Sequence, residues 1–324
     1  MDLPTIVLGD PMQAIFGFQG NQLVDWNAHV ETQFPQIGTL ATPWRWRNSG
    51  TEALGLWLLE ARGVLQRRQG VNLRTAPPEV QWVQLDAATA NQQRRTAAQI
   101  RTTGDEETVL IIGDALNVRG RHELSSQTPG ASSVESVDLG DLVAFARRFD
   151  MGAADAMEQL VRFPGELVTK VNATHLIARV ATLRGGRPVN PPTLAEEAAV
   201  AFAQTPTSSA ALQLLHQLDE QTSARVFRPE ILRCLKSSLR TVAVGGTTLY
   251  DAVVRARERN RHLSRTVARR SVGSTLLLKG LEADIAVITH SEEMDAPNLC
   301  VALTRGARRL VVCSSTPLLV PEKH

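Results

Sequence analysis

The sequence predicts an α/β protein in which the strands of a parallel sheet alternate with helices. Most of its apolar runs are continuous and of strand length, which is typical of strands buried on both faces of a parallel sheet. These runs are 5–8 (TIVL), 80–85 (VQWVQL), 108–113 (TVLIIG), 284–289 (DIAVIT) and 309–313 (RLVVC). Helical patterns separate the runs, and this alternation indicates a layered α/β domain.

The first clear helix is predicted over 49–68. Its apolar residues Leu54, Leu58, Ala61 and Leu65 recur at helical spacing and form one face.

The middle of the chain has a different character, because it contains helical periodicity and loops but no strong strand run. Three helices are predicted here, over 133–149, 152–163 and 207–221. Thr193 follows a Pro-rich stretch and is the expected N-cap of a further helix. The sheet is therefore expected to be split by a helical insertion of about 150 residues, a length that suits a domain of its own.

Composition places the chain among ordinary globular proteins. It has 324 residues, of which 43% are hydrophobic and 21% charged, and a net charge of +2. Its apolar runs are shorter than the ~20 residues that cross a bilayer, so no membrane partner and a cytoplasmic location are expected. Cys234, Cys300 and Cys313 are isolated, which predicts buried free thiols rather than disulfides or a metal site.

Arginine dominates the basic residues and gathers in one segment. The segment 255–270 (RARERNRHLSRTVARR) holds seven arginines and one glutamate. Such a stripe suits contact with phosphates, and it is equally compatible with a solvated helix face.

Four polar stretches lie at predicted strand ends, on the turns beside them, or at the first helix. Ligands of open α/β sheets gather near strand ends, at the carboxyl edge. The stretches are Asp10 with Gln13, 42–50 (TPWRWRNSG), 279–284 (KGLEAD) and 301–310 (VALTRGARRL). Taken singly, each has an ordinary structural explanation, such as a turn, a surface carboxylate or a pairing with a helix end.

In this order the stretches resemble motifs III to VI of the UvrD/Rep-type superfamily 1 DNA helicases. GDPMQAIFGFQG (9–20) is similar to motif III, and TLATPWRWRNSG (39–50) to motif IV. STLLLKGLEADIAVI (274–288) is similar to motif V, and NLCVALTRGARRLVVC (298–313) to motif VI. The resemblance covers roughly half of the chain. In an unrelated α/β protein, four motif-like stretches would have to occur in this order by coincidence.

The resemblance implies a RecA-like fold of the P-loop NTPase type. Residues 1–38 would be the remnant of a first RecA-like domain that carries motif III. Residues 39–118 and 271–324 would form a second RecA-like domain, and 119–270 the helical insertion.

The family binds ATP with Mg²⁺ between two such domains, and the resemblance assigns residues to that site. Gln13 would sense the γ-phosphate, because an amide both donates and accepts hydrogen bonds. Arg45 would lie near the same phosphate, although Arg47 offers a second register. Arg305 would be the arginine finger that stabilises charge in phosphoryl transfer.

Three further nucleotide contacts and three DNA contacts follow from the same motifs. Glu282 would contact the nucleotide sugar, and Asp10 and Gly280 would complete the nucleotide site. Phe18 would stack on a base of single-stranded DNA, which every base permits. The DNA contacts also include Thr275 and Phe16, which takes the usual Tyr position and is either core or DNA-facing.

The motifs depart from the family pattern at three positions. Gln19 replaces an arginine, Leu276 replaces a DNA-contacting histidine, and Ala283 follows KGLE where phenylalanine is common. These departures affect the predicted DNA contacts more than the nucleotide contacts.

Two motifs that hydrolysis requires are not found in these 324 residues. There is no Walker A sequence GxxxxGK[ST], which would cradle the phosphates. Asp105-Glu106 precedes a strand instead of following one, and 219–221 (DEQ) continues a predicted helix, so neither is a DExx box. The chain is therefore expected to begin inside the first RecA-like domain and to hydrolyse ATP negligibly alone.

Two functional hypotheses follow, and they leave open whether the chain alone is an enzyme. It is either the C-terminal part of an ATP-dependent DNA helicase, or a non-catalytic DNA- or protein-binding module derived from one. Its expected partners are single-stranded DNA and a separate chain that supplies the Walker A and DExx motifs. Ile6, Val7 and Leu8, without neighbouring strands, are expected to be exposed and to favour association.

Overall fold

The computed structural model describes the chain except for residues 1–4, 16–24, 187–188, 262–266 and 323–324. It consists of two compact units, the first formed by 1–129 with 269–324 and the second by 130–268. The second unit thus interrupts the first in sequence.

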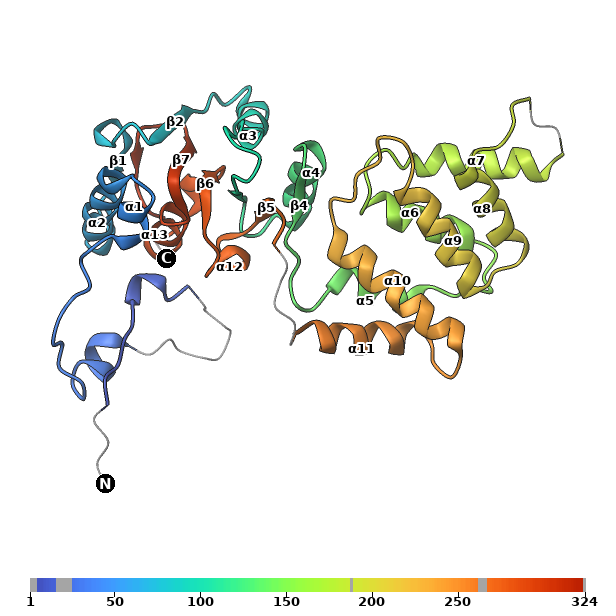
Figure 1. Cartoon of the computed structure of the whole chain (residues 1–324), viewed down its shortest axis with the longest axis horizontal. Helices are drawn as coiled ribbons and strands as arrows, with labels where there is room; N and C mark the ends of the chain where they lie inside the picture. Colours follow the sequence, from blue (N-terminus) through green and yellow to red (C-terminus); the bar gives the residue numbers. More distant parts are fainter. Residues whose placement is uncertain (1–4, 16–24, 187–188, 262–266, 323–324) are drawn as a thin grey trace. The chain divides into compact units, whose positions relative to one another are not determined.

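Five of the six strands of a parallel sheet lie in the first unit. Six strands form an all-parallel sheet in the order β2-β7-β6-β3-β5-β4 (Figure 1). Their bounds are β2 (Val80–Gln84), β3 (Val109–Ile112), β4 (Ala131–Ser133), β5 (Arg270–Gly273), β6 (Ala283–Ile288) and β7 (Gly306–Ser314). Four of the five predicted strands are confirmed, and the sequence reasoning missed the short β4 and β5.

Strand β3 lies in the middle of the sheet and is apolar throughout. All four of its residues are buried, and Ile111 is in register with Val272 of β5 on one side and Val287 of β6 on the other. A strand flanked on both sides and covered on both faces needs apolar residues at every position. This explains why β3 is a continuous run in the sequence.

Helices cover both faces of this sheet. The connection from β2 to β3 runs in one direction across it and the connection from β6 to β7 in the other, so right-handed crossovers place α3 and α13 on opposite faces. Helix α13 also packs against α2, and Figure 1 shows α1 and α2 on one side of the strands and α3 on the other.

The helical segments of the first unit include several short turns. They are η1 (Pro11–Gln13), η2 (Trp26–Val30), α1 (Trp44–Asn48), α2 (Glu52–Gln66), η3 (Leu73–Thr75), α3 (Ala90–Ala98), α4 (Val118–Gln127), α12 (Thr275–Leu278), η4 (Ser291–Glu293) and α13 (Ala296–Leu303). A two-stranded antiparallel sheet joins β1 (Val71–Asn72) to β8 (Leu318–Leu319). The predicted helix over 49–68 is confirmed as α2.

The predicted strand over 5–8 is wrong. Residues 5–8 form no strand, and Ile6 and Leu8 are 72% and 81% exposed. A strand needs a neighbouring strand to satisfy its backbone groups, and the sheet of the described residues ends at β2 and β4. The predicted exposure of these apolar side chains is confirmed.

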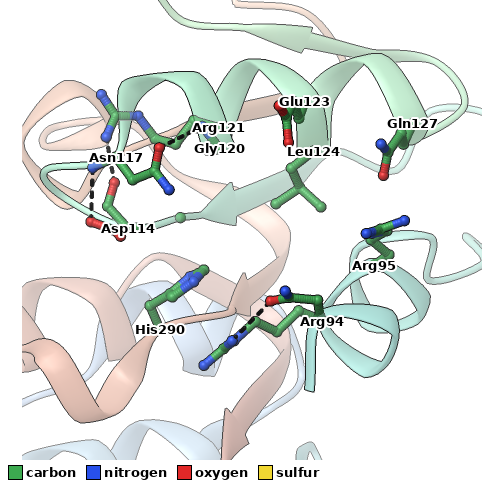
Figure 2. A pocket seen from close by; sticks show the side chains of 12 residues that line it. Arg94, Arg95, Asp114, Asn117, Gly120, Arg121, Glu123, Leu124, Gln127 and His290 are labelled. Atoms are coloured by element: carbon green, nitrogen blue, oxygen red, sulfur yellow. Dashed lines mark hydrogen bonds between the residues drawn. The ribbon is translucent and has the colours of Figure 1, made fainter. Parts of the chain in front are cut away.

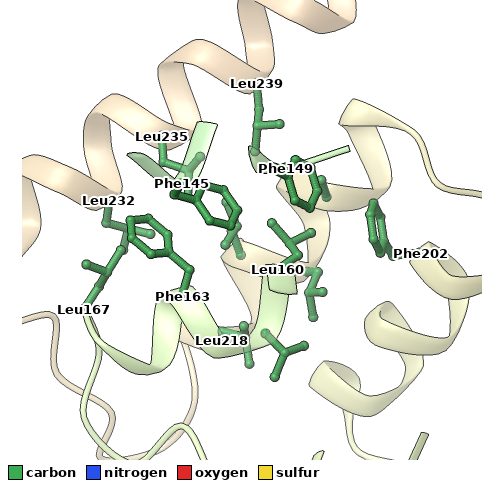
Figure 3. Close-up of a cluster of buried hydrophobic side chains, with 14 of the residues drawn as sticks. Phe145, Phe149, Leu160, Phe163, Leu167, Phe202, Leu218, Leu232, Leu235 and Leu239 are labelled. Atoms are coloured by element: carbon green, nitrogen blue, oxygen red, sulfur yellow. The ribbon is translucent and has the colours of Figure 1, made fainter. Parts of the chain in front are cut away.

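The second unit is helical apart from β4. Its helices are α5 (Gly140–Arg148), α6 (Ala156–Gly165), α7 (Ala173–Arg184), α8 (Leu194–Gln204), α9 (Ser208–Asp219), α10 (Pro229–Val244) and α11 (Leu249–Arg261). Their core contains four phenylalanines, of which Phe145 stacks on Phe163 at 4.3 Å and on Phe149 at 5.0 Å between ring centroids (Figure 3). The predicted N-cap Thr193 is confirmed and forms a capping box with Glu196.

Helix α5 begins later than the sequence predicts, and a buried ion cluster accounts for this. Arg228 is 2% exposed and pairs through two nitrogens with Glu135, at 2.7 and 2.8 Å, and with Asp141 at 2.7 Å. Glu135 is thereby fixed in the segment before α5 rather than in the helix. Helix α4 was not predicted; it lies almost entirely in the range 119–270 assigned to the insertion, but it belongs to the first unit.

Candidate functional site

Arg45, Glu282 and Arg305 meet where two neighbouring strands begin. Glu282 directly precedes β6 and Arg305 directly precedes β7, and the first residues of these strands, Ala283 and Gly306, are in register. Arg45 on α1 donates from Nη1 to the carbonyl of Thr304 at 2.6 Å and from Nη2 to the Glu282 carboxylate. The cluster therefore lies at the amino edge of β6 and β7, not at the carboxyl edge where open α/β sheets usually collect ligands.

Helix α1 is fastened to the start of β7, and this fixes Arg45. Trp46 Nε1 donates to the carbonyl of Gly306 at 2.9 Å, and Thr51 Oγ1 donates to the carbonyl of Ala307 at 2.6 Å. Gly55 on α2 allows this approach, because a Cβ there would lie 2.7 Å from Pro43 and 2.9 Å from Trp46.

Arg47, the second candidate of the predicted motif IV, lies apart from the cluster. Its side chain is 53% exposed, its Nε is 3.8 Å from Glu52, and its guanidinium stands over the ring of Trp44 at 5.4 Å. Of the two arginines, the described structure brings only Arg45 to Glu282.

Arg305 is buried at 4% exposure and is held by the protein itself. Its guanidinium donates to the carbonyls of Val301 at 2.9 Å and Leu281 at 3.0 Å, and to Thr304 Oγ1 at 3.1 Å. These bonds use three of the five N–H groups of an arginine. Burial and the neighbouring Arg45 lower the pKa of Arg305, and the charge of Glu282 opposes them.

The turn η1 brings Gln13 next to this cluster. Gln13 Nε2 donates to Asp10 Oδ2 at 3.0 Å, and Lys279 Nζ donates to the Gln13 carbonyl at 2.7 Å. Burial and the charge of Arg305 lower the pKa of Lys279, while Asp10 raises it. Gly280 follows Lys279 with a φ of 83°, a left-handed turn that glycine adopts without strain.

Residues from all four predicted motifs thus lie in one neighbourhood. The predicted DNA contacts Phe16 and Phe18, and the departure at Gln19, lie outside the described residues. Thr275 is 3% exposed in the first turn of α12, at the carboxyl end of β5, while the adjacent Leu276 is 44% exposed.

A pocket that the sequence reasoning missed lies at the carboxyl ends of β3 and β6. It has a volume of about 160 Å³, and Figure 2 shows the groups around it. Its polar lining includes Arg94, Arg95, Asp114, Asn117, Arg121 and His290. Gly113 ends the predicted strand 108–113 and Asp114 follows it, so the carboxyl-edge rule could have identified this pocket.

The polar groups of this pocket also order its loop. Asp114 accepts hydrogen bonds from the backbone N–H groups of Leu116 at 2.7 Å and Asn117 at 3.0 Å. Burial raises the pKa of Asp114, but these bonds and the nearby His290 and Arg121 outweigh it, so the pKa is lowered. His290 has its pKa lowered to about 4, mainly by burial and then by Arg94, while Asp114 opposes the shift.

The arginine-rich segment 255–270 is divided between the two units. Arg257 and Arg261 on α11 pair with Glu258, and Arg261 also pairs with Asp138. Arg270 on β5 donates to the carbonyls of Ala98 at 2.7 Å and Ile100 at 2.8 Å, at the end of α3. These described arginines pair with carboxylates of the second unit or with carbonyls at the end of α3 in the first.

The acidic pair at the end of α9 has a structural partner. Asp219 is the last residue of α9 and accepts a hydrogen bond from Lys236 Nζ at 2.7 Å. It belongs to the second unit, whereas Arg305 belongs to the first. This placement agrees with its interpretation as a helix end.

The described part of the chain has neither a metal-ligand cluster nor a membrane-spanning helix. Within it, no group of three or more His, Cys, Asp or Glu side chains is placed to hold a metal ion. Among the described helices, none combines the length and apolarity that crossing a membrane requires. Cys234, Cys300 and Cys313 are free and buried, as predicted.

Compared with models of known protein families and with curated proteins, the sequence matches none.

Proposed function

We propose that the chain is the C-terminal part of an ATP-dependent DNA helicase of the UvrD/Rep type, with a RecA-like second domain and half of a composite ATP site. One observation carries this proposal. Gln13, Arg45, Glu282 and Arg305 come from four separate stretches that resemble helicase motifs. In the fold, Arg45 bonds to Glu282 and the Thr304 carbonyl, Arg305 bonds to the Leu281 carbonyl, and the Lys279 side chain bonds to the Gln13 carbonyl.

The side chains of this cluster suit the terminal phosphates of a nucleotide. Guanidinium groups bind phosphate oxygens through two parallel N–H bonds, and two such groups are present in Arg45 and Arg305. ATP supplies the phosphoryl group and the energy of the reaction. Arg45 and Arg305 would stabilise the charge that develops on that group, and Gln13 would orient the polar groups beside it.

The cluster does not by itself fit Mg²⁺ or the inner phosphates. The carboxylates of Asp10 and Glu282 both pair with arginines, Arg62 and Arg45 respectively. The chain also lacks the Walker A residues that hold phosphates and magnesium. We therefore propose that another polypeptide segment supplies them, either within a larger protein or on a separate chain.

ATP binding tests the nucleotide half-site. We expect the chain to bind ATP weakly in isothermal titration, and Arg45→Ala to weaken binding about tenfold, the loss of one charge-assisted contact. Arg47→Ala is the matched control, because Arg47 lies two residues from Arg45 on the same helix and its side chain is 53% exposed. Absence of ATP binding, or equal losses in both variants, would contradict the proposal.

The second candidate, a non-catalytic DNA-binding module, is favoured by the pocket at the carboxyl edge. Arg94, Arg95 and Arg121 all line it, and Arg95 is exposed. Binding of a labelled single-stranded oligonucleotide is expected to weaken with salt, and Arg95→Ala is expected to lower the salt slope by about one. Arg119→Ala, on an exposed residue of α4, is the control. DNA binding without ATP binding would favour the module.

A further inference from the structure

Arg62 lies outside all four motif-like stretches, yet it makes a bidentate ion pair with Asp10 near the candidate site. Its Nη1 donates to Asp10 Oδ2 and its Nη2 to Asp10 Oδ1, both at 2.6 Å. The pair joins residues that are distant in sequence, since Arg62 is on α2 and Asp10 precedes η1. Arg62 thus fastens the start of the chain to the folded unit.

The helix that carries Arg62 is firmly placed. Leu58, Ala61 and Leu65 of α2 are all buried, and α2 packs against α13. Helix α13 in turn ends directly before Thr304 and Arg305. Arg62 therefore projects from the same rigid layer that positions the candidate site.

The carboxylate of Asp10 is fully used. Besides the two bonds from Arg62, its Oδ1 accepts from the Met12 N–H at 3.0 Å and its Oδ2 accepts from Gln13 Nε2 at 3.0 Å. An ionised carboxylate has about four lone-pair sites, and all are thereby occupied. The bonds run without interruption from α2 through Asp10 to the Gln13 side chain.

We propose that Arg62 is a positioning residue that holds Gln13 in the candidate nucleotide site through Asp10. This inference rests on the proposed function for the role of Gln13. An exposed, isolated ion pair contributes little. Here the pair is two-pronged, and its side chains are only 32% and 24% exposed. Lys279 also fixes the Gln13 backbone, so Arg62 and Lys279 clamp the η1 turn through two separate residues, Asp10 and Gln13.

Hydrogen exchange tests the clamp without any nucleotide. In Arg62→Ala, exchange in a peptide covering 8–15 is expected to be about tenfold faster, as one charge-assisted anchor is lost. Arg62→Lys keeps the charge but not the fork, and an intermediate rate is expected. Arg62→Lys also replaces Arg62→Ala in this test if Arg62→Ala does not fold. Arg67→Ala, at the end of the same helix, is the control and is expected to match the wild type.

A double-mutant cycle on ATP binding tests the link to Gln13. If Arg62 acts through Gln13, the losses caused by Arg62→Ala and Gln13→Ala are not additive. Additive losses, or unchanged exchange over 8–15 in Arg62→Ala, would overturn the inference. If the wild-type chain binds no ATP, the proposed function fails, while the exchange experiment still decides whether Arg62 clamps the turn.

Discussion

At the scale of single residues, several arginines bond to backbone carbonyls or to carboxylates inside the protein. Arg305 and Arg270 each donate to carbonyls at helix ends, and Arg228 neutralises two carboxylates in the second unit. Guanidinium groups suit this role because they carry several donors in a fixed plane. The high arginine content therefore reflects internal hydrogen bonds and ion pairs as much as phosphate binding.

His290 makes stability depend on pH. Its pKa is lowered to about 4 in the folded protein, from an ordinary value near 6.5, so the unfolded chain takes up its proton first as pH falls. Stability is therefore present above about pH 6.5 and is lost as pH falls toward 4, by up to about 3 kcal/mol.

Chemical denaturation at pH 7 and pH 4.5 measures this effect. His290→Asn cannot take up the proton, so its free energy of unfolding is expected to fall less between the two pH values than that of the wild type. His216→Gln, at an exposed position on α9, should behave like the wild type. An identical pH dependence in all three proteins would refute the assignment.

At the scale of elements, the short segments that join strands decide the candidate site. The sheet register places Ala283 beside Gly306, and this brings the residues just before them, Glu282 and Arg305, together. Helix α1 adds Arg45 through contacts of Trp46 and Thr51 with β7. The positions of these side chains follow from strand register and from two backbone carbonyls, not from the motif sequences alone.

The segment 5–8 is the element most open to association. Ile6 and Leu8 are exposed, and exposed apolar segments of β-forming composition favour pairing with other chains. We expect the purified chain to bind a hydrophobic dye and to self-associate at high concentration. Ile6→Ser with Leu8→Ser should reduce both effects in dye fluorescence and light scattering. A soluble monomer that binds no dye would contradict this expectation.

At the scale of the whole molecule, two units with separate cores share one chain. The first has its core around β3, β6 and β7, and the second around Phe145, Phe163 and their neighbours. The candidate site and the pocket both belong to the first unit. In the proposed helicase, this division would separate the nucleotide and DNA contacts from the helical insertion.

The whole chain is expected to hydrolyse ATP negligibly. Its arginines and Gln13 would act on phosphates that Walker A residues must hold, and its sequence contains no Walker A motif. A steady-state phosphate-release assay with single-stranded DNA present measures this. Turnover above background that Arg305→Ala abolishes would refute the prediction, whereas turnover that persists in Arg305→Ala would point to a contaminating enzyme.

The sequence by itself determined the central strands, α2 and the Thr193 cap, because buried strands and capped helices need particular residue types locally. It also picked out Gln13, Arg45, Glu282 and Arg305 as candidate site residues. Only the tertiary structure showed that Arg45 rather than Arg47 contacts Glu282 and that the Arg305 guanidinium points inward. It also showed that 5–8 form no strand and that Arg62 pairs with Asp10. The physical reason is that strand pairing and ion pairs depend on contacts between segments that are distant in sequence. Local residue patterns do not specify these contacts.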